Sequence, residues 1–230
     1  LERKFDLAIN VLGADHIEQF KDIKAAIQAL GYDSERIQVV LHQFVTLLQD
    51  GKPARMSTRE GHYILLDDIL DEVGSDAIRY FMLAHSPDSR IDFDLDLARK
   101  QSNENPVFYI QNAHVRCASI ARVAAERGID YDDGDVSHLN HPLELALIRK
   151  MVQIPEIMTL SISEMSPHKI AIWAHQEFAS VFHQTYEEAR ALHDSVSPEI
   201  MKARLKLYAA ARIALAQLLE LMGMSAPDHM

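Results

Sequence analysis

PARMSTREG, residues 53–61, is the stretch that decides the fold, because an α/β pattern precedes it and a long helical pattern follows it. Within this stretch, Arg55 and Arg59 flank the pair Met56 and Ser57. Cations held over a polyphosphate stabilise the charge that develops when pyrophosphate leaves. The stretch therefore suits a loop that closes over a nucleotide, although an ordinary exposed loop with scattered charges has the same composition.

The sequence before this loop predicts one βαβ unit. Residues 7–13 and 37–48 are apolar or β-branched, as in buried strands of a parallel sheet, and residues 16–30 carry apolar side chains at helical spacing. Two strands joined by one helix imply a right-handed crossover. One unit is too little for a complete sheet, so we expect further strands to precede Leu1.

The residues GADH, 13–16, lie between the first strand and the helix, at the edge of the sheet where ligands bind in such folds. Glycine lets the backbone approach a ligand, and a helix N-terminus favours an anion. A helix cap with a tight turn explains these residues equally well. Lys52, just before the loop, is a further candidate cation for phosphates.

The sequence after the loop is predominantly helical. Short helices are expected at residues 67–73 and 76–84, followed by a strand over residues 90–98, where apolar and acidic residues alternate. Long amphipathic helices follow at residues 105–127, 142–160, 167–193 and 198–222. Four long helices joined by short loops predict a bundle.

Composition limits the functions open to the chain. It has 230 residues, 48% of them hydrophobic, and a formal net charge of −11, so it is not a generally basic nucleic-acid binder. A local basic patch remains compatible with RNA binding. The single cysteine, Cys117, excludes an intramolecular disulfide and a thiolate zinc cluster. No secretory signal or long apolar stretch is visible, so we expect a cytoplasmic monomer away from membranes.

Two further clusters of charge are open to interpretation. Asp92, Asp94 and Asp96 alternate with apolar residues and lack the glycine and glutamate of a calcium-binding loop, so no metal site is expected. Lys202 and Arg204 belong to a cationic cluster near the start of the last helix. That cluster is either a patch for phosphates or a solvated helix face.

Several sequence blocks resemble those of one known family. In chain order they read VLGADH (11–16), PARMSTREG (53–61), LLDDILDEVGSDAIRYFML (65–83), SPDSRIDFDLDLA (86–98), QSNENPVFYIQNAHVR (101–116) and SAPDHM (225–230). Together they closely resemble the arginyl-tRNA synthetases, which are class I aminoacyl-tRNA synthetases. DAIR, residues 76–79, matches the motif after which the family's anticodon-binding domain is named. The resemblance covers nearly the whole chain and is weakest between Asp130 and Ser197.

The resemblance implies the α/β remnant of a Rossmann-like nucleotide-binding domain, followed by an all-α helical bundle that is the class I synthetase anticodon-binding domain. Residues 1–72 are then the C-terminal part of the catalytic domain with its signature loop, residues 73–102 a connecting region and residues 103–230 the anticodon-binding domain. The implied activity is that of an arginine–tRNA ligase. It forms arginyl-adenylate from L-arginine and ATP, with Mg²⁺ on the nucleotide, and then transfers the arginyl group to tRNA-Arg.

Candidate site residues fall into three groups. By resemblance, the catalytic signature loop comprises Arg55, Met56, Ser57, Thr58 and Arg59. Asp15 and His16 match the adenosine side of the pocket, and Gly13 and Lys52 are added as nucleotide-binding candidates. The tRNA-binding candidates are Tyr109, Gln111, His114, Arg116 and Met230 by resemblance, and Lys202 and Arg204 from their charge.

The loop departs from the general Lys-Met-Ser-Lys pattern, because Arg55 and Thr58 occupy the lysine positions. The cation that meets pyrophosphate is therefore open among Arg59, Lys52 and a lysine elsewhere. The His-Ile-Gly-His-type motif of class I enzymes does not occur in these 230 residues. We expect the chain to bind tRNA but not to aminoacylate it alone. The alternative is a non-catalytic helical RNA-binding module with a vestigial nucleotide fold.

Overall fold

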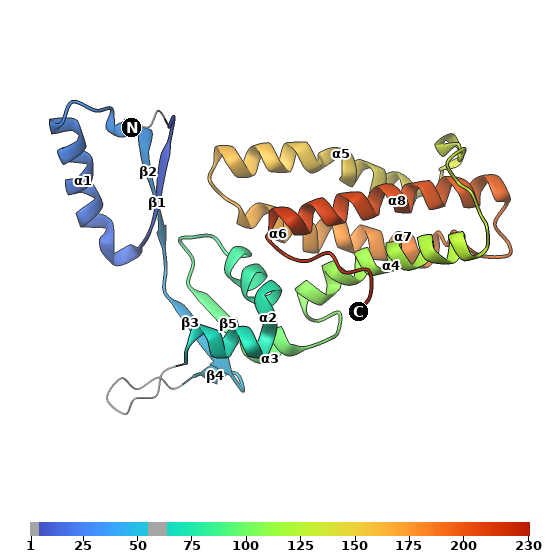
Figure 1. Cartoon of the computed structure of the whole chain (residues 1–230), viewed down its shortest axis with the longest axis horizontal. Coiled ribbons are helices and arrows are strands. Elements are labelled where there is room, and N and C mark those ends of the chain that lie inside the picture. Colours follow the sequence, from blue (N-terminus) through green and yellow to red (C-terminus); the bar gives the residue numbers. More distant parts are fainter. Residues whose placement is uncertain (1–4, 55–63) are drawn as a thin grey trace. The chain divides into compact units, whose positions relative to one another are not determined.

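The computed structural model describes residues 5–54 and 64–230, and the chain divides into two compact units (Figure 1). Among the described residues, the α/β unit comprises 5–54 and 85–94, and the helical unit comprises 64–84 and 95–230. An α/β part and an all-α bundle, as expected from the sequence, are both present. No helix in the described ranges combines the length and the apolar character needed to cross a membrane.

The first sheet of the α/β unit has the predicted βαβ connection. β1 (Ala8–Gly13) pairs in parallel with β2 (Ile37–His42), with Ala8 opposite Ile37 and Gly13 opposite His42. The connection consists of the 3-10 turn η1 (Ala14–His16), helix α1 (Ile17–Ala29) and the 3-10 turn η2 (Ser34–Arg36).

The expectation that the first strand is buried is wrong for the described chain. Ile9 and Val11 on β1 are 52% and 67% exposed. The physical reason is that β2 is the only described strand that pairs with β1, and one neighbour cannot cover both its edges and faces.

The second sheet has the strand order β4–β3–β5. β3 (Val45–Gln49) is antiparallel to β4 (Lys52–Pro53) and parallel to β5 (Ile91–Asp94). Asp50 and Gly51 turn the hairpin with φ angles of 52° and 68°. These left-handed values are the ones a two-residue hairpin turn requires.

Two strand predictions are wrong in extent. Residues 37–48 form two strands, β2 and β3, which belong to different sheets. At the break, Gln43 donates its backbone N–H to Pro87 O at 3.1 Å, which takes it out of the β1–β2 ladder.

The strand predicted over residues 90–98 ends at Asp94, where helix α3 (Leu95–Arg99) begins. Leu95 and Ala98 are both buried. Their i, i+3 spacing fits one side of a helical turn, and the preceding period-two alternation hid this second periodicity.

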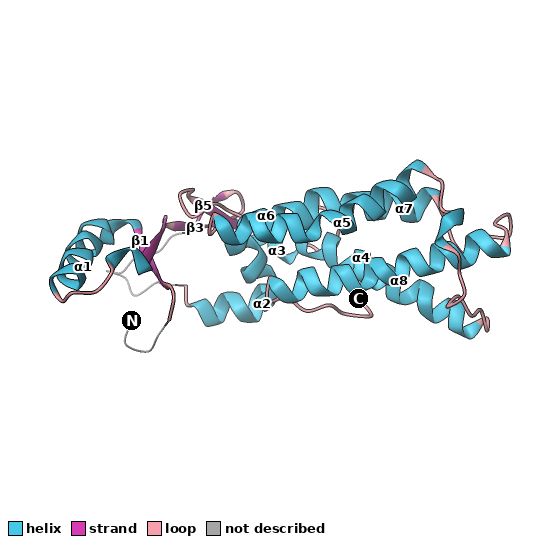
Figure 2. Ribbon diagram, turned by 90° about the horizontal axis from the view of Figure 1, so that it is seen from above, coloured by secondary structure: helices cyan, strands magenta, loops and turns pink. Residues whose placement is uncertain are grey.

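The remaining helices form the helical unit, and the long ones run side by side (Figure 2). They are α2 (Leu66–Leu83), α4 (Pro106–Glu126), the 3-10 turn η3 (Val136–His138), α5 (Pro142–Ser163), α6 (His168–Trp173), the π-helical turn η4 (Ala174–Ala179), α7 (Ser180–Glu188) and α8 (Pro198–Leu221). Because α6, η4 and α7 follow one another without a break, the structure has the four long helices that the sequence predicts. The third, predicted over residues 167–193, is wrong in extent, because it ends at Glu188 where Ala189 leaves helical geometry.

Local sequence signals set the helix ends. Gly74, with φ 80° and ψ 163°, breaks α2 into the two short helices that the sequence predicts. The Asn105 side chain accepts a hydrogen bond from the Val107 N–H at 3.0 Å, and Pro106 fills the first turn of α4. Gly223 ends α8 in the left-handed conformation, φ 69°.

The core of the helical unit lies between α4, α7 and α8. Ile110 and Ala113 on α4, Phe182 on α7 and Leu215 on α8 are fully buried. Alanine at such positions lets helix backbones approach closely, and close packing holds the side chains in single arrangements. The bundle is therefore a rigid frame for the side chains on its surface.

Candidate nucleic-acid interface

One side of α4 carries aromatic and cationic side chains. Tyr109, Arg116 and Arg127 are separated by about two and about three helical turns, which places them along one stripe of the helix. Tyr109 and Arg116 are among the residues that the sequence assigns to RNA, and the structure brings them together in one network with α7.

Arg116 joins α4 to α7. Its Nη1 donates to Glu187 Oε1 at 2.8 Å and lies 3.3 Å from His183 Nδ1, and its guanidinium carbon lies 4.9 Å from the centre of the Tyr186 ring. A guanidinium has no acceptor atom, so His183 Nδ1 accepts and Nε2 carries the hydrogen. That hydrogen is donated to Tyr109 O at 2.9 Å.

Burial disfavours the protonated form of two histidines in this region. Burial lowers the pKa of His183, and it also lowers the pKa of His175. His175 lies in the π-helical turn, and its ring centre is 5.4 Å from that of Tyr109 in an edge-on contact. The π-helical turn is thus the local irregularity that brings a histidine ring beside Tyr109.

Beside the Arg116 network is a cleft of about 340 Å³ between α4 and the end of α7. Its lining consists of Ser119, Ile120, Val123 and Arg127 from α4, and of Tyr186, Glu187, Arg190, Ala191 and Leu192 from α7 and the segment after it. The volume is in the range of small-ligand sites, and the lining combines apolar walls with a few polar groups. We call this feature the α4–α7 cleft.

Arg127 and Arg190 give the α4–α7 cleft its charge. Both residues are exposed, and within residues 5–54 and 64–230 neither guanidinium forms an ion pair. The Glu187 carboxylate of the same lining is already paired with Arg116. Arg190 Nε does donate to Glu187 O, at 3.4 Å. In a chain with a net charge of −11, two arginines without an ion pair share a lining with the Tyr186 ring, a combination with the chemistry to bind a phosphate and an adjacent base.

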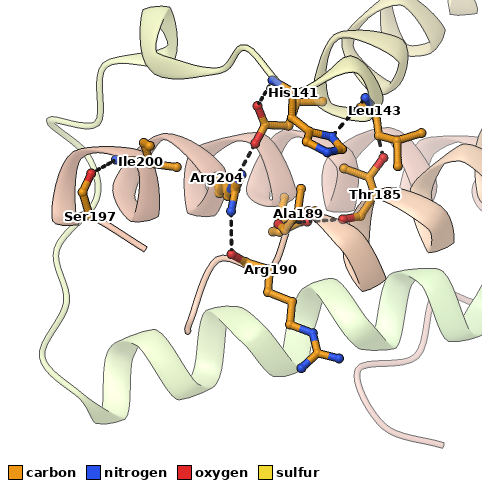
Figure 3. Close-up of polar contacts among 10 residues, drawn as sticks. His141, Leu143, Thr185, Ala189, Arg190, Ser197, Ile200 and Arg204 are labelled. Atoms are coloured by element: carbon orange, nitrogen blue, oxygen red, sulfur yellow. Dashed lines mark hydrogen bonds and ion pairs between the residues drawn. The ribbon is translucent and has the colours of Figure 1, made fainter. Parts of the chain in front are cut away.

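The segment that carries Arg190 is held by α8 and α5 (Figure 3). Arg204 Nη1 donates to Arg190 O at 2.9 Å, and Arg204 Nε donates to Glu144 Oε1 at 2.6 Å. The Glu144 side chain is 1% exposed and that of Arg204 is 15% exposed. Figure 3 shows the Arg190 side chain leaving this network toward α4.

The cationic cluster predicted near the start of α8 makes contacts within the chain. Lys202 Nζ pairs with Asp133 at 2.8 Å, and Arg204 pairs with buried Glu144. Lys206 Nζ donates to Asp132 O at 2.9 Å. Neither Lys202 nor Arg204 lines the α4–α7 cleft.

The sequence did not single out Arg127 or Arg190. For Arg127 a signal exists, because it continues the helical stripe of Arg116. For Arg190 the sequence has no such signal. Its position depends on the contact with Arg204, which lies in a different helix.

Residues 225–230 turn back along α4, beside α2 (Figure 1). Gln111 Nε2 donates to Asp76 Oδ2 at 2.7 Å and to Ser225 O at 3.0 Å. The Ser225 N–H donates to the Asp76 carboxylate at 3.2 Å, and the Ser225 hydroxyl donates to it as well. His114 Nδ1 donates to Pro227 O at 2.8 Å.

This arrangement determines how exposed three of the residues predicted to contact RNA are. Gln111 and His114 are only 7% and 3% exposed, because residues 225–230 cover them. Met230 is 59% exposed and lines a separate cavity of about 410 Å³ together with Asp76 and Gln111. The structure therefore does not bring these residues into the α4–α7 cleft.

The residues expected at the nucleotide lie at the carboxyl end of β1. Gly13 is its last residue, and the side chains of Asp15 and His16 in η1 are 63% and 45% exposed. A Cβ on Gly13 would lie 2.6 Å from Asp15 Oδ1, so a larger residue would displace the exposed Asp15 side chain. An open backbone with exposed polar side chains at a helix start fits a nucleotide.

Lys52 lies in β4, in the other sheet. The predicted catalytic residues Arg55, Met56, Ser57, Thr58 and Arg59 lie outside the described residues. Across the described ranges, no group of three His, Cys, Asp or Glu side chains is arranged to hold a metal ion.

Two protein-family models match the chain. The DALR anticodon binding domain matches residues 110–230, which contain nearly all of α4 and the whole α4–α7 cleft. The catalytic domain of the class I tRNA synthetases (R) matches residues 1–91. The DAIR motif, residues 76–79, falls in the second match, although the structure places it in the helical unit.

Individual relatives show the same similarity. The arginine–tRNA ligase of Dehalococcoides mccartyi (strain CBDB1) is 46% identical over 230 residues, which are 100% of this chain and 41% of that protein. The arginine–tRNA ligase of Heliobacterium modesticaldum is 44% identical over 236 residues and is likewise covered to 41%. The chain thus spans 41% of the length of these relatives.

Solved structures agree with the fold. A putative arginyl-tRNA synthetase from Campylobacter jejuni superposes with a TM-score of 0.87 at 31% identity, covering 100% of this chain and 49% of that one. The arginyl-tRNA synthetase of Thermus thermophilus shares the fold, with a TM-score of 0.80 at 23% identity over 99% of this chain and 42% of that one.

Proposed function

Because the chain belongs to the arginyl-tRNA synthetase family, we propose that the protein containing it attaches L-arginine to tRNA-Arg in the cytoplasm through arginyl-adenylate. ATP, with Mg²⁺, supplies the adenylyl group that activates the arginine carboxylate. Gly13, Asp15 and His16 bind the adenosine side of this nucleotide. Lys52 and the loop of residues 55–59 supply cations for its phosphates.

The helical unit binds the anticodon arm of the tRNA through the α4–α7 cleft. The observation that carries this proposal is that Arg127 and Arg190, which form no ion pair with any described residue, share a lining with the Tyr186 ring in a chain with a net charge of −11. Arginine binds phosphate with two parallel hydrogen bonds, and an unstacked base packs on an aromatic ring. The lining of the cleft offers both kinds of contact.

Four other residues expected to contact RNA have different roles. Two of them support the cleft, and two contact RNA outside it. Arg116 and Tyr109 support the cleft from α4, Arg116 by holding the Tyr186 ring and Glu187. Lys202, whose side chain is 34% exposed, and Met230, at 59%, contact RNA outside the cleft.

Binding of the chain to a tRNA-Arg transcript at several salt concentrations tests the proposal. Arg127→Ala and Arg190→Ala should each weaken binding roughly tenfold, the scale of one charge-assisted hydrogen bond. Each should also lower the slope of log K against log salt by about one, because each removes one phosphate contact.

Arg149→Ala is the matched control. Arg149 is an exposed arginine on α5 that forms no ion pair with any described residue, and it lies outside the cleft. The proposal predicts unchanged binding for this variant. Equal losses for all three variants would mean that any surface cation contributes, and the cleft would then have no special role.

A further inference from the structure

We propose that Arg204 and Glu144 are positioning residues, which hold the main chain at Arg190 so that the Arg190 guanidinium faces the α4–α7 cleft, and that neither touches RNA. This inference rests on the proposed function of the cleft. It gives Arg204, which the sequence assigns to tRNA, an indirect role in tRNA binding.

Arg190 lies at a point of the chain that the helix itself does not fix. α7 ends at Glu188, and Ala189 has left helical geometry with φ −106° and ψ 57°. Carbonyl groups at a helix end have no partner within the helix and need donors from elsewhere. From α7, Glu187 O accepts a long hydrogen bond from Arg190 Nε at 3.4 Å, whereas the described donor to Arg190 O comes from another helix.

Side chains of α8 supply the missing donors (Figure 3). The single hydrogen of Tyr208 Oη is donated toward Ala189 O at 2.8 Å, and the other carbonyl within reach, Thr185 O at 3.1 Å, already accepts from the Ala189 N–H. Arg204 Nη1 donates to the next carbonyl, Arg190 O, at 2.9 Å. The two residues that follow α7 are therefore held to α8 by hydrogen bonds to their carbonyl groups, Ala189 O and Arg190 O.

Glu144 fixes the orientation of Arg204. The two side chains form a short ion pair, 2.6 Å from Nε to Oε1, in which Glu144 is 1% exposed. The second oxygen, Oε2, accepts from the His141 N–H at 2.9 Å, so both oxygens of this buried carboxylate have a partner. A buried charge is tolerated when it is paired and hydrogen-bonded in this way. Because the guanidinium is planar, fixing Nε also fixes the direction in which Nη1 donates.

The same contacts argue against direct RNA binding by Arg204. Its side chain is 15% exposed, and its described hydrogen bonds are to Glu144 and Arg190 O. The Arg190 side chain, in contrast, is exposed and lines the cleft. The charge that reaches the cleft is that of Arg190, and Arg204 determines where it is held.

A double-mutant cycle with tRNA-Arg separates positioning from contact. Arg204→Lys keeps the charge, but a single ammonium cannot reproduce the planar, two-sided contact with Glu144 and Arg190 O. We expect a loss of tRNA affinity of several-fold, smaller than the roughly tenfold loss for Arg190→Ala. The double variant Arg190→Ala/Arg204→Lys should bind no more weakly than Arg190→Ala alone. Losses that multiply in the double variant would show that Arg204 contacts RNA independently and would overturn the proposal.

Amide hydrogen exchange provides a readout that does not depend on RNA. Arg204→Lys should speed exchange in residues 189–197, whereas Arg149→Lys, at an exposed position on α5, should not. Unchanged exchange in Arg204→Lys would overturn the positioning role even if tRNA binding fell. If the unaltered chain does not bind tRNA-Arg, the proposed function fails, and the exchange result still decides whether Arg204 holds Arg190.

Glu144→Gln is a second variant for the case in which Arg204→Lys does not fold. Glutamine keeps the volume of Glu144 but offers only one acceptor, so either the Arg204 Nε–H or the His141 N–H loses its partner. Its effects on exchange and on the affinity cycle should match those of Arg204→Lys. A normal exchange pattern in Glu144→Gln would likewise contradict the proposal.

Discussion

At the scale of the residue, the decisive feature is a neutral histidine between an arginine and a carbonyl. His183 accepts from Arg116 through Nδ1 and donates to Tyr109 O through Nε2. A proton added to Nδ1 would remove that acceptor and place a second cation beside the guanidinium. The arrangement on which the α4–α7 cleft depends therefore requires the uncharged imidazole.

This residue gives the helical unit a pH dependence with a definite sign. Burial lowers the pKa of His183 in the folded chain below the ordinary value of 6.5, so the unfolded chain binds more protons in that range. The stabilisation is complete above 6.5 and is lost as the pH falls through that value toward the folded pKa. His175, with its pKa lowered by burial, acts in the same direction.

We therefore expect the free energy of unfolding to decrease from about pH 7.5 to about pH 5.5 in urea titrations, and His183→Gln to reduce this dependence. His138→Gln, at an exposed position, is the matched control and should keep the full dependence. Carboxylates such as Asp133, whose pKa the hydrogen bond from Lys202 lowers from 3.8, titrate below this range. An identical pH dependence in His183→Gln and in the unaltered chain would contradict this assignment.

At the scale of the element, α2 and residues 225–230 are locked together. The Asp76 carboxylate accepts from Gln111 and from both the N–H and the hydroxyl of Ser225. Gly223 brings the chain to this place, and a Cβ there would lie 2.7 Å from Arg79 Nη1. The two charged ends of the DAIR motif thus face the chain after α8.

Asp76→Ala removes the common acceptor of these contacts. It should lower the free energy of unfolding by about 1–3 kcal/mol, the range for donors left without a partner, and release residues 225–230 to faster amide exchange. Asp71→Ala, which removes a carboxylate at an exposed position earlier in α2, is the control. If both variants lose the same stability and keep the exchange pattern, Asp76 does not anchor this segment.

Most of the helices were predictable from the sequence, whereas α3, the end of α7, parts of the strands and parts of the site were not. Asn105, Pro106 and Gly223 are local signals, and they mark helix ends in the structure as well. The limits of the strands depend on partners elsewhere in the chain, as the contact of Gln43 with Pro87 shows. The cleft depends on tertiary contacts in the same way. Arg116 is a candidate from the family resemblance, whereas Arg190 becomes a candidate only once its contact with α8 is known.

At the scale of the whole molecule, a chain of strongly negative net charge carries a local cationic site, the α4–α7 cleft, within its described residues. Its net charge of −11 opposes non-specific binding to nucleic acid, so affinity must come from a place where cations are unpaired. The α4–α7 cleft is such a place, and it lies within the range that matches the DALR anticodon binding domain. We therefore expect the binding of tRNA by this chain to depend on the anticodon arm.

The most direct test compares the binding of two transcripts to this chain at one moderate salt concentration. One is tRNA-Arg, and the other differs from it only in the anticodon. We expect clearly weaker binding of the altered transcript by the unaltered chain, and a smaller difference between the two transcripts for Arg190→Ala. Equal binding of both transcripts by the unaltered chain would contradict this expectation, because the helical unit would then contact phosphates without reading the anticodon.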